Sequence, residues 1–127
     1  ALYNTYTAAS PYASVQENGT DYLLTAVKMQ DYLKLYESCP KDRINPYFAP
    51  LLAGDFSNMP ETLILTAEFD PLRDEGEDYG KKLAEAGNYV EVHRIRDALH
   101  GFFALGIRFF HVQESFSYMN EFLKREV

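Results

Sequence analysis

Two residues that would serve as an acid and a base, Asp70 and His100, stand thirty positions apart in this sequence. A carboxylate that accepts the imidazole N–H fixes the tautomer of the ring and stabilises the imidazolium that forms when the base takes a proton. Gly101 leaves room for a tight turn after the histidine, and Phe102-Phe103 would help to exclude water. Taken singly, an Asp-Pro pair is a common turn, and a loop histidine is usually a surface or packing residue. The pair is therefore informative only if the fold brings the two side chains together.

The segments around the pair predict a strand, a helix, a second strand and a final helix. The expected strands are 62–67 and 89–95, and the expected helices run from the turn at 70–76 to about residue 86 and onward from about residue 112. Short apolar or β-branched runs indicate the strands, and apolar residues at helical spacing indicate the helices. This order predicts a βαβ unit with a parallel sheet, so both loops of the pair leave the same edge. Because two parallel strands make a poor sheet alone, we expect the edge of a larger structure.

The first half of the chain predicts less regular structure. Residues 1–20 show no sustained periodicity and are expected to be irregular. Thr25 is expected to cap a helix that runs to about Ser38 and ends at Cys39-Pro40. Residues 40–60 contain several prolines and are expected to form a long loop, of a length that is often functional.

Composition limits the classes of function. The 127 residues, 46% hydrophobic and 24% charged, are ordinary for one globular domain. A net charge of −7 without a basic stripe argues against nucleic-acid binding. Cys39 is the only cysteine, so an internal disulfide and zinc-ligand spacing are absent, which fits the cytoplasmic location that we expect. No apolar run approaches the ~20 residues of a membrane span.

Longer motifs resemble one enzyme family. Residues 59–76, which contain Asp70-Pro71-Leu72, resemble the acid-bearing segment of the hormone-sensitive-lipase-like carboxylesterases. Residues 97–103 are similar to the His-Gly-Phe segment of that family, and residues 45–52 to the loop that precedes its acid strand. Residues from about 10 to 40 are similar in placement to part of the cap over the acyl pocket. The resemblance spans nearly the whole chain.

The resemblance implies a fold and a set of roles. It implies a partial α/β-hydrolase fold in which residues 1–127 are the C-terminal segment of one domain, with a cap-like region at 10–40 and the acid strand, base loop and last helix at 59–127. Asp70 would be the acid of a catalytic triad and His100 its general base. The substrate would be a small or medium acyl ester, and no metal or organic cofactor would be needed.

Two parts of the family pattern do not occur in this sequence. No serine has glycines two positions away on both sides, and no glycine pair forms a His-Gly-Gly segment. The nucleophile precedes the acid and base in this fold, so both parts are expected upstream of residue 1. We therefore expect the chain to be the C-terminal portion of a serine carboxylester hydrolase, inactive alone for want of a nucleophile and oxyanion hole. The alternative is a non-catalytic binding or structural module derived from an esterase half. The isolated chain is expected to form a homo-oligomer that covers its apolar faces.

Other candidates have structural interpretations that we prefer. Asp74 and Glu75 are alternative acids, but carboxylates are common at helix N-termini. Asp97 is interpreted as a turn residue, and His93 and His111 as structural. An apolar group could line an acyl pocket, but such a helical stripe is more often plain core; its members are Leu23, Leu24, Met29 and Tyr32.

Overall fold

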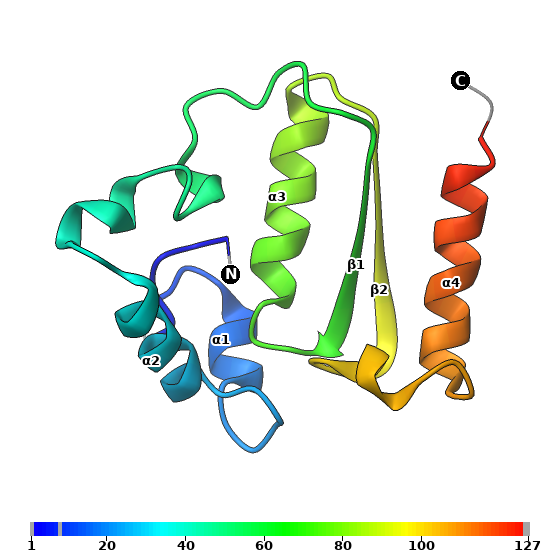
Figure 1. Ribbon diagram of the computed structural model, residues 1–127, viewed down its shortest axis with the longest axis horizontal. Helices are drawn as coiled ribbons and strands as arrows, with labels where there is room; N and C mark the ends of the chain where they lie inside the picture. The colour runs from blue at the N-terminus through cyan, green and yellow to red at the C-terminus, as the bar shows by residue number, and fades with distance from the viewer. Residues whose placement is uncertain (1, 8, 126–127) are drawn as a thin grey trace.

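The computed structural model describes residues 2–7 and 9–125 as an α/β arrangement (Figure 1). The elements in chain order are α1 (Ala13–Asn18), α2 (Ala26–Tyr36), the 3-10 helices η1 (Pro40–Ile44) and η2 (Pro50–Leu52), β1 (Thr62–Phe69), α3 (Arg73–Glu85), β2 (Val90–Leu99), the 3-10 helix η3 (Phe102–Leu105) and α4 (Phe110–Leu123). β1 and β2 pair in parallel, which confirms the predicted βαβ unit. α3 lies against one side of this pair and α4 against the other (Figure 1).

A bulge in β2 makes the two strands end at the same level. The strands pair without interruption as far as Ala67 opposite Ile95, and the next paired residues are Phe69 and Leu99. Between these two pairs, β2 therefore advances by four residues while β1 advances by two. Within the longer path, Asp97 has a φ of 57°, the left-handed conformation that strand irregularities often contain. The residues predicted as acid and base follow immediately after the paired ends.

Two glycines let α3 approach the sheet closely. A Cβ atom on Gly80 would lie 2.6 Å from Cγ2 of Val92, and one on Gly76 would lie 3.1 Å from Cγ2 of Thr66. No larger side chain fits the first position without a shift of the helix or the strand. The close packing of α3 against the sheet therefore determines where the turn that follows β1 joins the helix.

Apolar side chains gather in two clusters. One packs β1 and β2 against η3 and α4 and consists of Ala67, Ile95, Ala98, Phe102 and Val112. The other joins the N-terminal segment to α1 and α2 and consists of Tyr6, Val15, Leu24, Met29 and Leu33. The described residues thus bury apolar surface on the α4 side of the sheet and again beneath the N-terminal helices.

The structure corrects several sequence expectations. Residues 1–20 are not wholly irregular, because α1 forms at Ala13–Asn18; its six residues are too few for helical periodicity to be visible. The predicted cap on α2 is confirmed, since the Thr25 hydroxyl accepts the N–H of Lys28 at 3.3 Å. That helix ends at Tyr36, slightly before the expected end. α3 already begins at Arg73, inside the stretch predicted as a turn.

Candidate active site

The structure brings Asp70 and His100 into direct contact. The Nδ1 atom of His100 lies 2.7 Å from Oδ2 of Asp70. The other carboxylate oxygen, Oδ1, accepts the backbone N–H of Leu72 at 2.8 Å. Asp70 is buried, whereas the imidazole is 41% exposed. Neutral His100 that donates from Nδ1 leaves Nε2 with its lone pair, ready to take a proton.

Asp70 changes the proton affinity of the imidazole. The hydrogen bond to Asp70 raises the pKa of His100 above its ordinary value, burial of the ring lowers the pKa, and the negative charge of Asp70 raises it again. The hydrogen bond and the charge prevail, so the pKa of His100 is raised. This arrangement stabilises an imidazolium and holds the ring in one tautomer, as the acid partner of a base must do.

The turn after the histidine leads into two adjacent phenylalanines, whose ring centroids lie 4.8 Å apart. Gly101 has a φ of 76°, which a glycine adopts without strain, and η3 begins directly after it. Phe102 then packs in the core, while Phe103 stays 40% exposed. An open cavity of about 360 Å³ lies beside β1, and its lining includes Asp70, Gly101 and both phenylalanines. The two phenylalanines thus border the Asp70–His100 contact without enclosing it.

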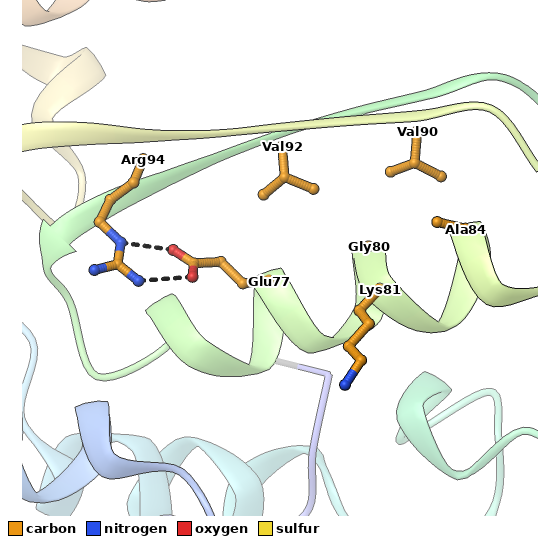
Figure 2. Close-up of a pocket in the computed structure, with 7 residues that line it drawn as sticks. All are labelled: Glu77, Gly80, Lys81, Ala84, Val90, Val92 and Arg94. Atoms are coloured by element: carbon orange, nitrogen blue, oxygen red, sulfur yellow. Dashed lines mark hydrogen bonds and ion pairs between the residues drawn. The ribbon is translucent and has the colours of Figure 1, made fainter.

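A second cavity, of about 410 Å³, lies between α3 and β2 and away from the pair (Figure 2). Val90 and Val92 face the helix there, and the carboxylate of Glu77 receives two hydrogen bonds from Arg94, at 2.8 and 2.7 Å (Figure 2). Thr66 donates a further hydrogen bond to Glu77 at 3.0 Å. These polar groups satisfy one another, so we interpret this cavity as a packing feature between helix and sheet.

The alternative acids lie elsewhere. Asp74 and Glu75 occupy the first turn of α3, as predicted. Both accept hydrogen bonds from the N-terminal part of the chain, and Asp74 also accepts one from Nε of Arg73 at 2.8 Å. Oδ2 of Asp74 accepts the N–H of Ser14 at 2.8 Å. Glu75 is buried and accepts hydrogen bonds from the N–H of Leu2, the N–H of Tyr3 and the hydroxyl of Tyr6, at 3.1, 3.0 and 2.6 Å. The buried role of Glu75 was not predicted, because its partners stand about seventy positions away in the sequence.

The remaining candidates have structural roles. Asp97 is exposed and forms part of the bulge, with its N–H donated to Glu68 at 2.8 Å. His93 stacks on Tyr118 with ring centroids 3.9 Å apart, and His111 packs near an aromatic ring at the start of α4.

The residues considered for an acyl pocket do not form one group. Leu24 and Met29 are buried in the N-terminal cluster, which agrees with the core interpretation. Leu23 and Tyr32 are exposed.

Sequence reasoning missed Ser14 and Asn18, whose buried side chains bind the turn at Asp70. The Ser14 hydroxyl donates to the Pro71 carbonyl at 2.9 Å, and the Asn18 amide lies 3.4 Å from the carbonyl of Asp70. The local sequence gave no signal for these contacts, because nothing in it indicated which loop α1 would face.

The parallel strands, the helices on both faces and the aspartate–histidine pair beyond the strand ends define an α/β protein of the hydrolase type. The family model described as the alpha/beta hydrolase fold matches residues 2–104, and the chain belongs to this family. The predicted partial α/β-hydrolase fold is therefore confirmed, as is the resemblance to its carboxylesterases.

Several relatives of the chain are named as ester hydrolases. The chain is 37% identical over 105 residues to the ethyl acetate hydrolase of Pseudomonas putida, a match that covers 83% of this chain and 33% of that protein. It is 45% identical over 73 residues to an arylesterase of Saccharolobus solfataricus, covering 57% of this chain and 24% of the relative. The hyperthermophilic esterase of Pyrobaculum calidifontis superimposes with a TM-score of 0.81 at 36% identity, over 94% of this chain and 37% of that structure. The chain thus spans between 24% and 37% of the length of these relatives.

The described residues lack two further features. None of the helices within 2–7 and 9–125 is long and apolar enough to cross a bilayer. The same residues contain no group of three or more His, Cys, Asp or Glu side chains placed to hold a metal ion.

Proposed function

We propose that this chain is the C-terminal portion of a serine carboxylester hydrolase, in which His100 is the general base and Asp70 the acid that orients it. The observation that carries the proposal is the 2.7 Å contact between Nδ1 of His100 and Oδ2 of Asp70. The nucleophilic serine and the oxyanion hole belong to a segment outside this sequence. Small and medium acyl esters are the proposed substrates, in keeping with the relative named for ethyl acetate.

The proposed chemistry assigns one proton path to the imidazole. Nε2 of His100 takes the proton of the serine hydroxyl as the oxygen attacks the ester carbonyl, and then gives it to the departing alcohol. Asp70 stabilises the imidazolium in between and remains ionised. Water, activated in the same way, attacks the acyl-enzyme and releases the acid.

The geometry supports this function over a non-catalytic module. A binding module would not require a buried carboxylate with both oxygens hydrogen-bonded and one of them on a half-exposed imidazole. The raised pKa of His100 supports the same choice.

Location and assembly are part of the proposal. We place the protein in the cytoplasm, in keeping with a single cysteine. The 127-residue chain on its own would self-associate through exposed apolar side chains, which include Leu105, Ile107, Phe109 and Phe110.

The test is hydrolysis of p-nitrophenyl acetate by two forms of the protein. The first is the 127-residue chain, for which no turnover above its His100→Ala variant is expected. The second is the chain produced together with the coding sequence that precedes it, for which turnover is expected and is lost on His100→Ala. Turnover by the longer form that survives His100→Ala would refute the assignment of the base.

A further inference from the structure

We propose that α1 is a clamp on the turn that carries Asp70, and that Ser14 and Asn18 are positioning residues that aim the Asp70 carboxylate at His100. The inference deepens the proposed function, on which it rests, because it takes this pair to be the acid and base of the triad. Neither residue touches the imidazole. Both act through the backbone of the turn.

The aim of the carboxylate depends on that backbone. β1 ends at Phe69 and α3 begins at Arg73, so residues 70–72 lie outside regular structure. The two oxygens of Asp70 are tied in different directions, one to the N–H of Leu72 and the other to His100. A small movement of the turn therefore changes the distance and angle of the hydrogen bond to the ring, whose strength depends steeply on both.

Ser14 bridges the turn and the first turn of α3. Its hydroxyl donates to the carbonyl of Pro71 at 2.9 Å and accepts the N–H of Asp74 at 3.2 Å. The backbone N–H of Ser14 donates to the Asp74 carboxylate at 2.8 Å. Ser14 is fully buried, at 0% exposure. It therefore fixes the turn relative to the helix that follows.

Asn18 lies one helical turn later on the same face of α1 and fixes the turn relative to the strand. Its side-chain nitrogen lies 3.4 Å from the carbonyl oxygens of both Glu68 and Asp70. The amide has two N–H groups, so it can donate one hydrogen bond to each carbonyl. Asn18 is 3% exposed. Arg73 binds the Glu68 carbonyl from α3 at 3.0 Å, so the strand end is held by two elements.

Packing alone does not explain these two side chains. α1 has six residues and lacks a side-chain cap at its start, so it is too short to be stable without tertiary contacts. An apolar side chain would supply such contacts without the cost of burying a polar group. Instead, the buried hydroxyl and amide converge on three carbonyls of one short segment, those of Glu68, Asp70 and Pro71. This convergence points to control of the position of the turn.

The test is an NMR titration of the histidine rings in the 127-residue chain. The unmodified chain and Asp70→Asn define the two ends of the scale for the pKa of His100. We expect Asn18→Ala and Ser14→Ala to give His100 pKa values between these ends. Gln16→Ala is the matched control, because Gln16 lies on the exposed side of α1 and its side chain donates to the carbonyl of Thr7, away from the turn. It should titrate like the unmodified chain.

A purely structural role would lower the stability of the variants without changing this titration. The proposal is overturned if Asn18→Ala and Ser14→Ala fold, by circular dichroism, and give the His100 pKa of the unmodified chain. Ser14→Ala removes a single oxygen and is decisive if Asn18→Ala does not fold. The titration does not require ester turnover. An inactive longer protein with the expected titration would therefore reject the proposed function and leave the clamp standing.

Discussion

Removal of one hydroxyl, in Tyr6→Phe, should expose how strongly the N-terminal segment depends on Glu75. Tyr6 is 1% exposed, and its hydroxyl donates to the Glu75 carboxylate at 2.6 Å. A hydrogen bond to a charged group contributes about 1.5–3 kcal/mol. The substitution leaves no cavity larger than one oxygen atom, so the lost hydrogen bond dominates. We expect the free energy of unfolding to fall by about 2 kcal/mol at neutral pH.

The loss should depend on pH with a definite sign. Burial raises the pKa of Glu75, against the lowering effect of the Tyr6 hydroxyl and the backbone N–H groups. A carboxyl group whose folded-state pKa is raised contributes stability below its unfolded pKa and loses it as pH rises through the folded pKa. Removal of the hydroxyl raises the pKa of Glu75 further. The destabilisation by Tyr6→Phe should therefore be greater at about pH 8 than at about pH 4.

Urea unfolding followed by circular dichroism at both pH values measures the difference between the variant and the unmodified chain. Tyr12→Phe is the matched control, because the Tyr12 hydroxyl donates to Asp78 at 2.7 Å in a less buried setting. Because solvent screens the interaction with this more exposed carboxylate, the cost of Tyr12→Phe should be only about 0.5–1 kcal/mol. An equal loss for Tyr6→Phe at both pH values, or a larger loss at the lower one, would refute the reasoning about Glu75.

Three further outcomes are expected. Asp70→Asn should lower the pKa of His100 in an NMR titration, since the hydrogen bond to the charged carboxylate is the main cause of its rise. The contact between His100 and Asp70 stabilises the fold below the ordinary histidine pKa, and this stabilisation is lost as pH rises through the folded-state pKa of His100. The free energy of unfolding of Asp70→Asn should therefore lack that pH dependence. Because the ring is 41% exposed, the stabilisation should stay below about 1 kcal/mol. Gly80→Ala should lower the urea midpoint, because its Cβ would lie 2.6 Å from Val92 and overpacking costs about 1–3 kcal/mol, against about 1 kcal/mol gained in helix propensity. Light scattering of the unmodified chain at micromolar concentration should give a mass above that of the monomer. Phe110→Ser should lower the measured mass. A monomer mass for the unmodified chain would exclude self-association.

The sequence predicted the contact between Asp70 and His100 because their positions follow from topology. Consecutive parallel strands joined by a helix must end at one edge, so Asp70 and His100 could be expected to meet once the strands were recognised. The end of β2 could not be placed in the same way. Strand alternation is broken at Asp97, whose left-handed backbone no hydrophobic pattern indicates.

The supports of the pair were beyond sequence reasoning. Glu75 was expected near a helix N-terminus, where a carboxylate needs no special partner. Its contacts with Tyr3 and Tyr6 depend on how the N-terminal segment folds over α3. Ser14 and Asn18 belong to a helix too short to show a period, and their partners are backbone carbonyls, which every residue offers.

The bulge in β2 also has a consequence for how the histidine loop can vary. Ile95 and Ala98 both point into the α4 side of the core, although they are three residues apart and an uninterrupted strand would place them on opposite faces. The irregular backbone at Asp97 thus shifts the phase of alternation between the part of β2 before the bulge and the part after it. Loss of one residue here would turn the histidine toward the other face while leaving the sheet intact. The length of this segment must therefore be kept so that His100 stays on the correct face, even though the pairing of the sheet does not depend on it.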